Sequence, residues 1–354
     1  MLNRVIILNL LILLTASCGG GGGSSADSAA DDSWSVDTTF LFDGGPGKDG
    51  IPSIDIPSFL PVSSVDYIDD NELVIGIRIN DTVKAYPHKI LDYHEVLNGK
   101  IDQQKFVLSY CPLTGTAMAW DKNSAIGTGE FGVSGLLLNS NLILYDRDTD
   151  SHWPQMLMIS AQGPKKGTSA THLPVFETKW GTFKTMYPDA QVLDNNTGFA
   201  RDYQEYPYEF YRTLNNILFR INNQEDFRLH RKDRILGVKV GETKIAYVIE
   251  DFDDNIHVLN EQIDESPYAV FASSGKNFAV AFSRTLSDGT VLQFTPEYDQ
   301  LPIVASDNEG NMWDINGIAI SGSRQGQRLS TVFSYNAYWL AWASFYPETT
   351  IYNR

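Results

Sequence analysis

The segment Ile75-Gly76-Ile77-Arg78-Ile79-Asn80-Asp81-Thr82-Val83-Lys84-Ala85-Tyr86 contains two β-rich runs separated by the turn-forming pair Asn80-Asp81. Asn and Asp tolerate the backbone angles of two-residue hairpin turns, so the segment predicts a β-hairpin. The pattern returns at residues 236–247 as Leu-Gly-Val-Lys-Val-Gly-Glu-Thr-Lys-Ile-Ala-Tyr, and the closing tyrosines give the offset in numbering as 247 − 86 = 161. A hairpin that occurs twice at this distance indicates a repeated architecture.

Further blocks recur in the same order as the hairpin. Their offsets lie between 159 and 162, and they pair Val96-Leu97-Asn98 with Val258-Leu259-Asn260, Trp153 with Trp313, and Trp180 with Trp339. Because both order and spacing persist, we interpret the chain as a tandem duplication. The predicted units cover residues 66–193 and 230–353, and a connector rich in Tyr and Asn joins them at residues 194–229.

Each predicted unit consists of strands followed by a short helix. Further strand-like runs in the first unit lie at residues 105–111, 116–120, 128–133, 141–146 and 156–160. Thr178–Tyr187 and Tyr335–Tyr346 carry apolar residues at helical spacing and end before prolines, so each unit is expected to close with a short helix and a strand. The chain lacks the strand–helix alternation of a parallel sheet. We therefore predict an α+β fold, mostly antiparallel β with a few short helices, in which two repeated units pack together.

The N-terminus has the layout of a bacterial lipoprotein signal peptide. Arg4 precedes an apolar run from Val5 to Leu14, and small residues then lead to Cys18. The run is shorter than the ~20 apolar residues that span a bilayer. This arrangement resembles a lipobox, so residues 1–17 are predicted to be removed and Cys18 to be acylated. The alternative is an ordinary signal peptide with an incidental cysteine.

Residues 18–50 are predicted to form a flexible linker, because the first part of this segment contains mostly Gly, Ser and Asp. No Asp follows Cys18, so we expect an exported protein that is lipid-anchored to the outer membrane. Loss of Arg4 leaves a mature charge of 26 − 44 = −18. Such an acidic surface repels phosphate backbones, which argues against nucleic acid as a partner.

Cys111 is the single thiol left in the sequence once Cys18 is acylated. It lies in the motif Tyr110-Cys111-Pro112-Leu113-Thr114-Gly115-Thr116-Ala117, whose Pro and Gly predict a turn after a strand. We therefore expect the thiol at a strand end, where it faces a cleft. The corresponding position in the second unit is Ser273. A lone thiol outside the cytoplasm is a liability unless it is buried, bound to a metal or used in chemistry.

Much of residues 50–353 resembles a widespread bacterial family, catalogued as a domain of unknown function, that has exported and lipoprotein members. Besides the motif at 110–117, the resemblance rests on Ala85-Tyr86-Pro87, His94-Glu95, residues 131–136, Asn139-Ser140-Asn141, Tyr145-Asp146-Arg147, Trp153, Ser334-Tyr335-Asn336-Ala337 and Trp339. The resemblance implies no established activity. Many relatives have a second cysteine where this chain has Thr114, so a dithiol–disulfide cycle cannot operate here.

Three interpretations of Cys111 remain open. In the first, Cys111 is a catalytic nucleophile and His94 is its base, because an imidazole stabilises a thiolate; Asp92, Glu95 or Asn139 would orient the ring. In the second, a copper or zinc ion is bound by Cys111, His94, His88 and His152. In the third, Cys111 is a buried residue of a non-catalytic binding or structural scaffold, since unpaired cysteines are often buried.

Polar residues in and after the motif are candidate contacts for an unidentified small molecule or protein partner. These candidates are Tyr110, Thr114, Thr116, Ser134, Asn139, Asn141 and Arg147. The alternative is that they hold hairpins together through side-chain hydrogen bonds.

Overall fold

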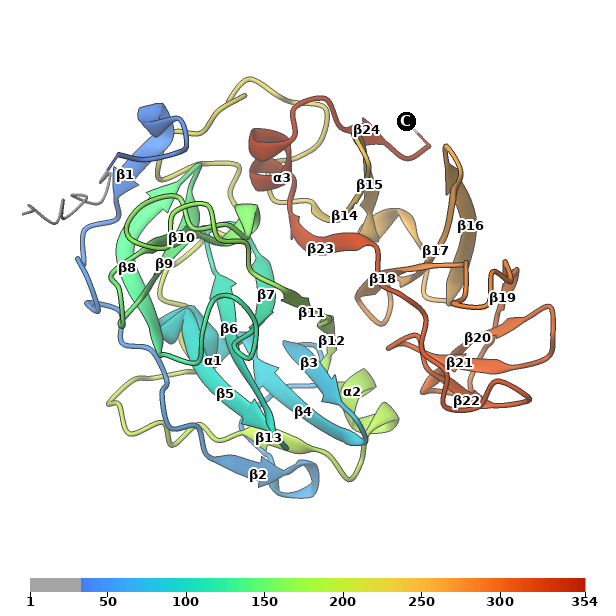
Figure 1. The fold of residues 1–354 in the computed structure, drawn as a ribbon. Helices are drawn as coiled ribbons and strands as arrows, with labels where there is room; N and C mark the ends of the chain where they lie inside the picture. Colours follow the sequence, from blue (N-terminus) through green and yellow to red (C-terminus); the bar gives the residue numbers. More distant parts are fainter. Residues whose placement is uncertain (1–32, 354) are drawn as a thin grey trace, which may run out of the picture. The chain divides into compact units, whose positions relative to one another are not determined.

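The computed structural model describes residues 33–353 of the 354-residue chain. The predicted signal peptide, the predicted acylation site Cys18 and the first part of the predicted linker lie outside the described residues. The described residues form mostly antiparallel β-sheets with three short α-helices, as the sequence predicted (Figure 1). None of the described helices has both the length and the apolar character needed to cross a membrane.

Three sheets contain the strands of the first half of the chain. The first has the order β12-β3-β4-β13-β2, formed by Phe176–Lys179, Leu73–Ile79, Thr82–Pro87, Gln191–Leu193 and Phe59–Pro61. The second has the order β11-β7-β6-β5, formed by His172–Leu173, Thr116–Asp121, Gln104–Cys111 and Val96–Ile101. The third has the order β1-β8-β9-β10, formed by Leu41–Asp43, Phe131–Leu138, Asn141–Asp146 and His152–Pro154.

Three sheets also contain the strands of the second half. The first has the order β23-β14-β15-β24, formed by Phe333–Tyr338, Arg234–Val240, Thr243–Val248 and Thr350–Ile351. The second has the order β16-β17-β18, formed by His257–Ile263, Ser266–Ser273 and Phe278–Ser283. The third has the order β19-β20-β21-β22, formed by Phe294–Pro296, Ile303–Asp307, Met312–Asp314 and Ala319–Ser321.

The sheets of the two halves follow similar plans. In β12-β3-β4-β13, the hairpin has an antiparallel neighbour on one side and the parallel strand β13 on the other. In β23-β14-β15-β24, the hairpin likewise has an antiparallel neighbour and the parallel strand β24. In each half, a helix connects the antiparallel neighbour to the parallel strand.

The two predicted helices are present as α2 (Trp180–Met186) and α3 (Trp339–Phe345). The predicted range of the second began too early, because β23 continues to Tyr338. Helix α1 (His88–His94) was not predicted, since seven residues are too few to show a helical pattern. Short 3-10 turns occupy Thr38–Phe40, Val62–Ser64, Gln155–Leu157 and Ile249–Asp251.

The predicted hairpin at residues 75–86 forms from strands β3 and β4, and Asn80 has the positive φ of 53° that its turn requires. The glycine shared by both hairpins has a packing role. A Cβ atom on Gly76 would lie 2.1 Å from the ring of Phe176, and one on Gly237 would lie 2.2 Å from the ring of Trp342. An aromatic side chain therefore covers the strand directly at each glycine, which leaves no room for a larger residue.

Two predicted boundaries were wrong. Residues 33–50 were assigned to the flexible linker, but β1 pairs in an antiparallel manner with β8 and joins the fold. Residues 156–160 were predicted as a strand, but they contain the end of a 3-10 turn and only an isolated bridge from Ile159 to Ser169. Residues 194–233, all of them described, contain neither helix nor strand.

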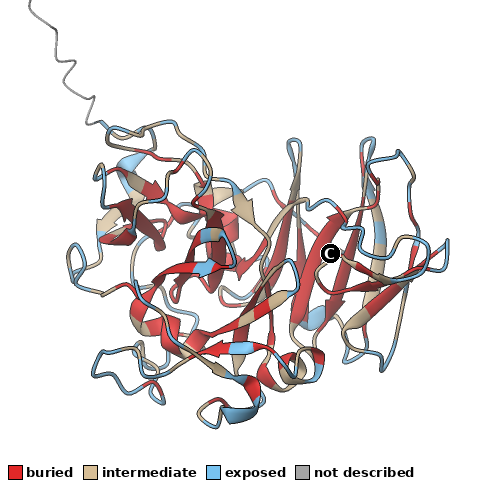
Figure 2. Ribbon diagram, turned by 60° about the horizontal axis from the view of Figure 1, so that its bottom comes forward, coloured by how far each residue is buried: buried red, intermediate tan, exposed pale blue. Residues whose placement is uncertain are grey.

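Buried residues follow the sheets and helices in both halves, whereas exposed residues gather in the loops (Figure 2). One buried cluster draws on both halves, because it contains Cys111 and Trp153 together with Trp339 and Trp342. The halves therefore share a hydrophobic core.

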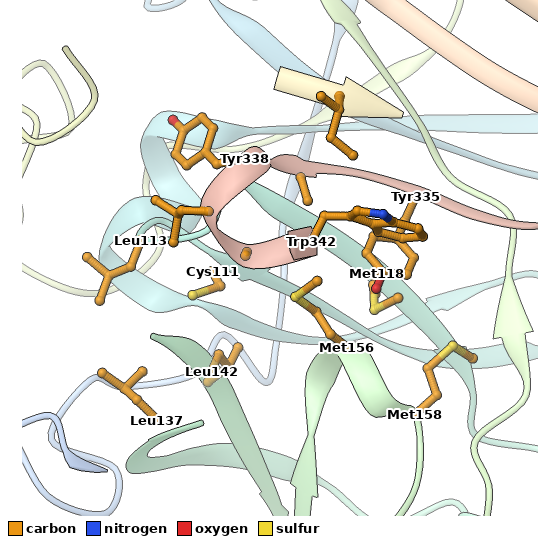
Figure 3. Packing of buried hydrophobic residues seen from close by; sticks show 14 of the residues in the cluster. Cys111, Leu113, Met118, Leu137, Leu142, Met156, Met158, Tyr335, Tyr338 and Trp342 are labelled. Carbon is orange, nitrogen blue, oxygen red and sulfur yellow. The ribbon is translucent and has the colours of Figure 1, made fainter. Parts of the chain in front are cut away.

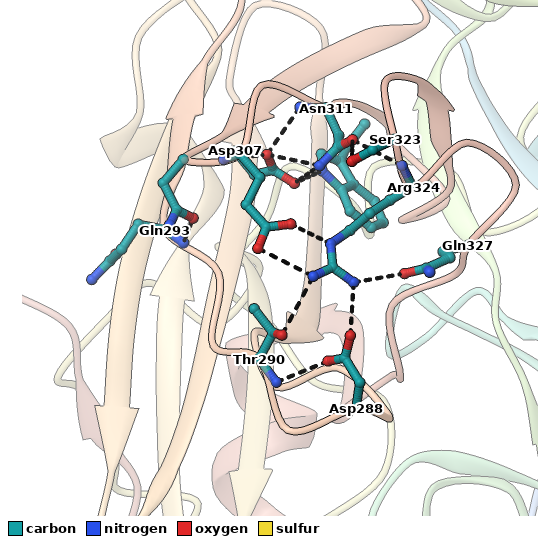
Figure 4. A network of polar contacts seen from close by, with 11 residues as sticks. Asp288, Thr290, Gln293, Asp307, Asn311, Ser323, Arg324 and Gln327 are labelled. Atoms are coloured by element: carbon teal, nitrogen blue, oxygen red, sulfur yellow. Dashed lines mark hydrogen bonds and ion pairs between the residues drawn. The ribbon is translucent and has the colours of Figure 1, made fainter.

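Buried aspartates stabilise corresponding turns in the two halves. Trp153 donates from its indole nitrogen to Asp146 at 2.9 Å, and Trp313 donates to Asp307 at 2.8 Å. Around Asp307, a polar network extends to Arg324, whose guanidinium pairs with Asp288 and Glu309 (Figure 4). Asp146 also accepts from Thr149, so the acidic stretch after β9 is a closed turn.

Candidate functional site

Cys111 lies at the end of β6, as predicted, but its side chain faces the core and not a cleft (Figure 3). Only 1% of the residue is exposed, and its Sγ donates a long hydrogen bond of 3.6 Å to the carbonyl oxygen of Ser140. Burial, reinforced by the nearby Glu95 carboxylate, raises the pKa of the thiol to about 11. The thiol is therefore protonated at neutral pH, which is the opposite of what a nucleophile or a metal ligand needs.

The predicted pairing of Cys111 with His94 is not formed, because both ring nitrogens of His94 are engaged elsewhere. Nδ1 lies 2.8 Å from the carbonyl oxygen of Pro52, and Nε2 lies 2.6 Å from the hydroxyl of Tyr203. The ring of Phe199 packs beside the imidazole. The structure therefore does not supply the base that the nucleophile hypothesis required.

The predicted metal ligands are also not assembled. Nε2 of His88 lies 2.8 Å from the carboxylate of Glu177, and the ring of His152 packs against Trp34. Among residues 33–353, no group of three or more His, Cys, Asp and Glu side chains could hold a metal ion. The histidines that were predicted to share one metal site therefore have different protein partners.

The motif residues Thr114 and Thr116 bond to neighbouring structure. Asn141 donates to Oγ1 of Thr114 at 3.0 Å and to the side chain of Gln155 at 2.7 Å. The hydroxyl of Thr116 donates to the carbonyl oxygen of Thr114 at 3.1 Å. These buried contacts tie the turn after β6 to β9, which matches the structural alternative for these candidates.

The remaining candidates, on β8 and in the turns that follow β8 and β9, also have protein partners. Ser134 donates to the carbonyl oxygen of Ile143 within the hairpin. The side chain of Asn139 accepts the backbone N–H of Asn222 and so anchors the connector. Arg147 pairs with Asp55 at 2.6 Å.

Tyr110, the last of the candidate contacts, lines a cavity. This cavity has a volume of about 320 Å³ and lies where the first half, the connector and the second half meet. It is lined by Asn71, Glu72, Leu73, His88, Lys89, Tyr110, Gly115, Arg212, Lys232, Arg234, Glu250 and Tyr338. Four cationic side chains thus line it together with the carboxylates of Glu72 and Glu250, on a chain whose net charge is −17.

Arg212 comes from the connector and is held by a buried carboxylate. Its guanidinium lies 2.5 Å from Asp92, whose side chain is only 2% exposed, and it stacks 3.9 Å from the ring centroid of Tyr206. Burial raises the pKa of Asp92 to about 6, although Arg212 opposes the shift. Asp92 is therefore ionised at neutral pH and fixes the guanidinium at the cavity wall.

Arg234, on β14, is held in a similar way. It donates to Glu177 at 3.1 Å and to Asn277 at 3.0 Å, while its Nε–H is buried without a hydrogen-bond partner among the described residues. Burial would raise the pKa of Glu177, but Arg234 and His88 hold it below its ordinary value. Burial lowers the pKa of His88, so this imidazole is neutral at neutral pH.

Lys232 completes the basic side of the cavity. Its ammonium group donates to the carbonyl oxygen of Asn216 at 2.6 Å and lies 3.4 Å from the ring centroid of Tyr211. Burial and the neighbouring Arg231 lower the pKa of Lys232 to about 7. A bound anion would favour the charged form of this group.

Two backbone hydrogen bonds join the halves beside the cavity. The N–H of Tyr338 donates to the carbonyl oxygen of Thr114 at 2.7 Å, and the N–H of Lys179 donates to that of Lys276 at 3.1 Å. Gly115 has a φ of 58°, and a Cβ atom there would lie 2.9 Å from the ring of Tyr338. The motif that contains Cys111 thus forms a seat for the second half.

Sequence reasoning missed Arg212, Lys232 and Arg234, because nothing in a single sequence places the connector against helix α1. One signal was available, since several lining residues lie at matching positions of the two units predicted from the sequence. At the offset found for the hairpins, these pairs are Asn71 with Lys232, Leu73 with Arg234, and Lys89 with Glu250.

A comparison with protein-family models matches residues 48–349 to a family described as "Protein of unknown function (DUF3179)". The chain has no match among curated proteins or solved structures.

Proposed function

The chain belongs to the DUF3179 family of proteins of unknown function, and from this premise we propose that it is a binding protein that holds a small anionic molecule in the cavity between its halves. One observation carries the proposal: two guanidinium groups on the cavity wall, those of Arg212 and Arg234, are each fixed by a buried carboxylate. A guanidinium that is already oriented loses little conformational entropy when a ligand binds.

The arrangement of charge favours an anion. The carboxylates of Asp92 and Glu177 are each 2% exposed and lie behind the arginines, whereas 34% of the Arg212 side chain is exposed. Carboxylates and phosphates match the planar donor set of a guanidinium. The ammonium group of Lys232, which also lines the cavity, adds a further N–H donor.

The size and the remaining walls of the cavity limit the ligand. Its 320 Å³ lies at the lower end of the roughly 300–1,000 Å³ that small-molecule sites occupy. Tyr110 and Tyr338 supply aromatic surface. A small organic carboxylate or phosphate fits these walls better than a polymer.

Calorimetric titration with succinate and with inorganic phosphate tests the proposal. We expect at least one of these probes to bind, and Arg212→Met to weaken that binding roughly tenfold or more, because a charge-assisted hydrogen bond is lost. Arg324→Met is the matched control, since the Arg324 guanidinium is likewise fixed by carboxylates, those of Asp288 and Glu309, but does not line the cavity. Absence of binding by the wild type, or equal loss in both variants, would contradict the proposal.

Cys111 has a structural role in this proposal. Its burial and raised pKa support the non-catalytic scaffold among the three interpretations of the thiol. Neither the catalytic nor the soft-metal interpretation gains a partner residue from the described contacts of Cys111 and His94.

We further propose that the protein is exported and anchored to the outer membrane through acylated Cys18. The support is the sequence pattern around this residue, which lies outside the described residues. Intact mass measurement of the membrane-extracted protein tests it. The expected species lacks residues 1–17 and carries acyl chains, whereas an unmodified Cys18 would contradict the anchor.

We also propose that the two halves arose by tandem duplication. The shared strand order, the buried Asp–Trp pairs and the two backbone hydrogen bonds exchanged between the halves support this origin. The donors Lys179 and Tyr338 differ in numbering by 338 − 179 = 159, and the acceptors Thr114 and Lys276 by 276 − 114 = 162. If the halves are duplicates, as proposed, each hydrogen bond joins the same two positions with the halves exchanged, which is the pattern of a two-fold arrangement.

A further inference from the structure

Exposed apolar side chains are concentrated in the connector. Four of them form what we call the connector patch, and their exposed fractions are 72% for Phe210, 51% for Leu214, 52% for Leu218 and 61% for Phe227. Among the described residues, only four other large apolar side chains are comparably exposed, and of these only Phe199 lies in the connector. Such a concentration of apolar surface on a folded protein indicates an interaction site.

Contacts within the connector hold the patch together. The N–H of Leu214 donates to the carbonyl oxygen of Phe210 at 3.1 Å, so both side chains belong to one turn. Arg231 donates to the carbonyl oxygen of Asn215 at 2.8 Å, and its guanidinium lies 5.1 Å from the ring centroid of Phe227. Arg231 therefore links the beginning and the end of the patch.

Residues 210–231, which carry the connector patch, have a small positive charge although the chain is acidic, and two of their arginines, Arg212 and Arg228, are already paired with Asp92 and Asp226. Residues 210–231 contain four arginines and two acidic residues, a balance of 4 − 2 = +2, whereas the whole chain carries −17. Arg220 is exposed and lies 5.8 Å from the ring centroid of Phe42. Apolar side chains interspersed with arginines are typical of segments that lie in the interface of a membrane with anionic lipids.

Strand β1, in the N-terminal part of the described chain, contacts the connector beside the patch. Strand β1 starts eight residues after Ser33, and its Phe42 packs against Phe219, the neighbour of Leu218, with ring centroids 6.2 Å apart. In Figure 1 the upper, gold part of the connector passes beside β1. The proposed anchor at Cys18 precedes Ser33, the first described residue, by 33 − 18 = 15 residues.

We propose that the connector patch lies on the lipid surface to which the protein is anchored, with its apolar side chains in the headgroup region and the exposed Arg220 on a lipid phosphate. The inference rests on the proposed acylation of Cys18, which keeps the patch near lipid. Docking would also immobilise one wall of the cavity, because the carbonyl groups that hold Lys232 belong to Leu214 and Asn216.

Fluorescence quenching by lipid tests the proposal on the acylated, full-length mature protein. The protein is reconstituted into vesicles of phosphatidylethanolamine and phosphatidylglycerol, with or without bromine on the acyl chains. Phe227→Trp is compared with Tyr298→Trp, a matched control with 54% exposure in the loop before β20. Brominated lipid is expected to remove roughly half of the added fluorescence of Phe227→Trp, because interfacial side chains reach the acyl boundary, and little of that of Tyr298→Trp.

The outcomes separate this inference from the proposed anchor. Acylated protein in which both variants are quenched equally would overturn the docking and leave the anchor intact. Protein that lacks acyl chains would overturn the anchor, and the docking would then be upheld only if Phe227→Trp were still quenched selectively. A blue shift of Phe227→Trp that follows protein concentration and not lipid would assign the patch to a second copy of the chain and overturn the proposal.

Discussion

The guanidinium group of Arg212 lies 2.5 Å from the carboxylate of Asp92, and this ion pair joins the connector to helix α1. Asp92 is almost fully buried, whereas Arg212 is one-third exposed at the cavity. The contact therefore neutralises a carboxylate that burial penalises and also presents the remaining N–H groups of the guanidinium to a ligand. In the proposed function, binding and stability are therefore coupled through the same two residues.

Removing one member of this ion pair is expected to destabilise the fold more than removing both members together. Arg212→Met leaves the Asp92 carboxylate buried without its counter-ion, which we expect to cost about 2–4 kcal/mol, since Arg212 is partly solvated. Adding Asp92→Asn removes the stranded charge and is expected to recover part of this loss. Urea denaturation of both single variants and the double variant measures the coupling, and strictly additive losses would contradict it.

Glu95 is expected to make stability depend on pH. Burial raises the pKa of Glu95 to about 7, from an ordinary value of 4.5, although Tyr208 donates to its carboxylate at 3.2 Å. The folded protein therefore binds this proton more tightly than the unfolded chain, and the contribution of Glu95 to stability falls as the pH rises from 4.5 to about 7. Glu95→Gln should change stability little near pH 4 and raise it by about 2–3 kcal/mol near pH 8.

Urea denaturation at the two pH values tests the role of Glu95. Glu242→Gln is the control, because the Glu242 side chain is 96% exposed. A Glu95→Gln variant that loses the same stability at both pH values would show that the carboxylate is ionised and bonded in the folded protein.

Alkylation measures the state of Cys111 directly. With a pKa of about 11, on the order of one thiol in ten thousand is ionised at neutral pH, and burial restricts access further. Iodoacetamide should therefore modify the native protein only slowly near pH 7, and the rate should keep rising toward pH 11. The urea-unfolded chain should react with the ordinary pKa of about 8.5. Equal rates for native and unfolded protein near pH 7 would return the nucleophile hypothesis to consideration.

Local patterns in the sequence were sufficient to predict much of the fold. The Asn80-Asp81 turn and the prolines after the two helices depend on backbone preferences of single residues, and the structure places hairpins and helices there. Helix α1 escaped prediction because its seven residues are stabilised by packing, with Ile90 and Leu91 fully buried, and not by a recognisable periodic pattern.

The candidate site was much harder to predict, because it depends on contacts between distant segments. Arg212 meets Asp92 from far along the chain, and the connector that carries Arg212 has no regular structure from which its position follows. Cys111 was predicted to be reactive because thiols are rare and chemically reactive. Whether a thiol faces a cleft or a core is decided by the elements packed over it, which here include α3. Residue type alone therefore overstated its chemistry.

Gly115 lies where the motif that contains Cys111 seats the second half of the chain, and its substitution is expected to destabilise this contact. Its φ of 58° strains any residue with a Cβ atom, and that atom would also lie 2.9 Å from the ring of Tyr338. Gly241 separates the cost of backbone strain from the cost of the contact with Tyr338. It has a nearly identical φ of 56°, but no heavy atom lies within 4 Å of the position that its Cβ would take. Gly241→Ala should cost about 1 kcal/mol from backbone strain alone, and Gly115→Ala about 1–3 kcal/mol more, because the ring must move.

Thermal denaturation and probe titration of both variants provide the test. Since Tyr338 lines the cavity, only Gly115→Ala should also weaken binding of succinate or phosphate. Equal destabilisation of the two variants would show that the ring of Tyr338 yields without cost and that the motif does not seat the second half.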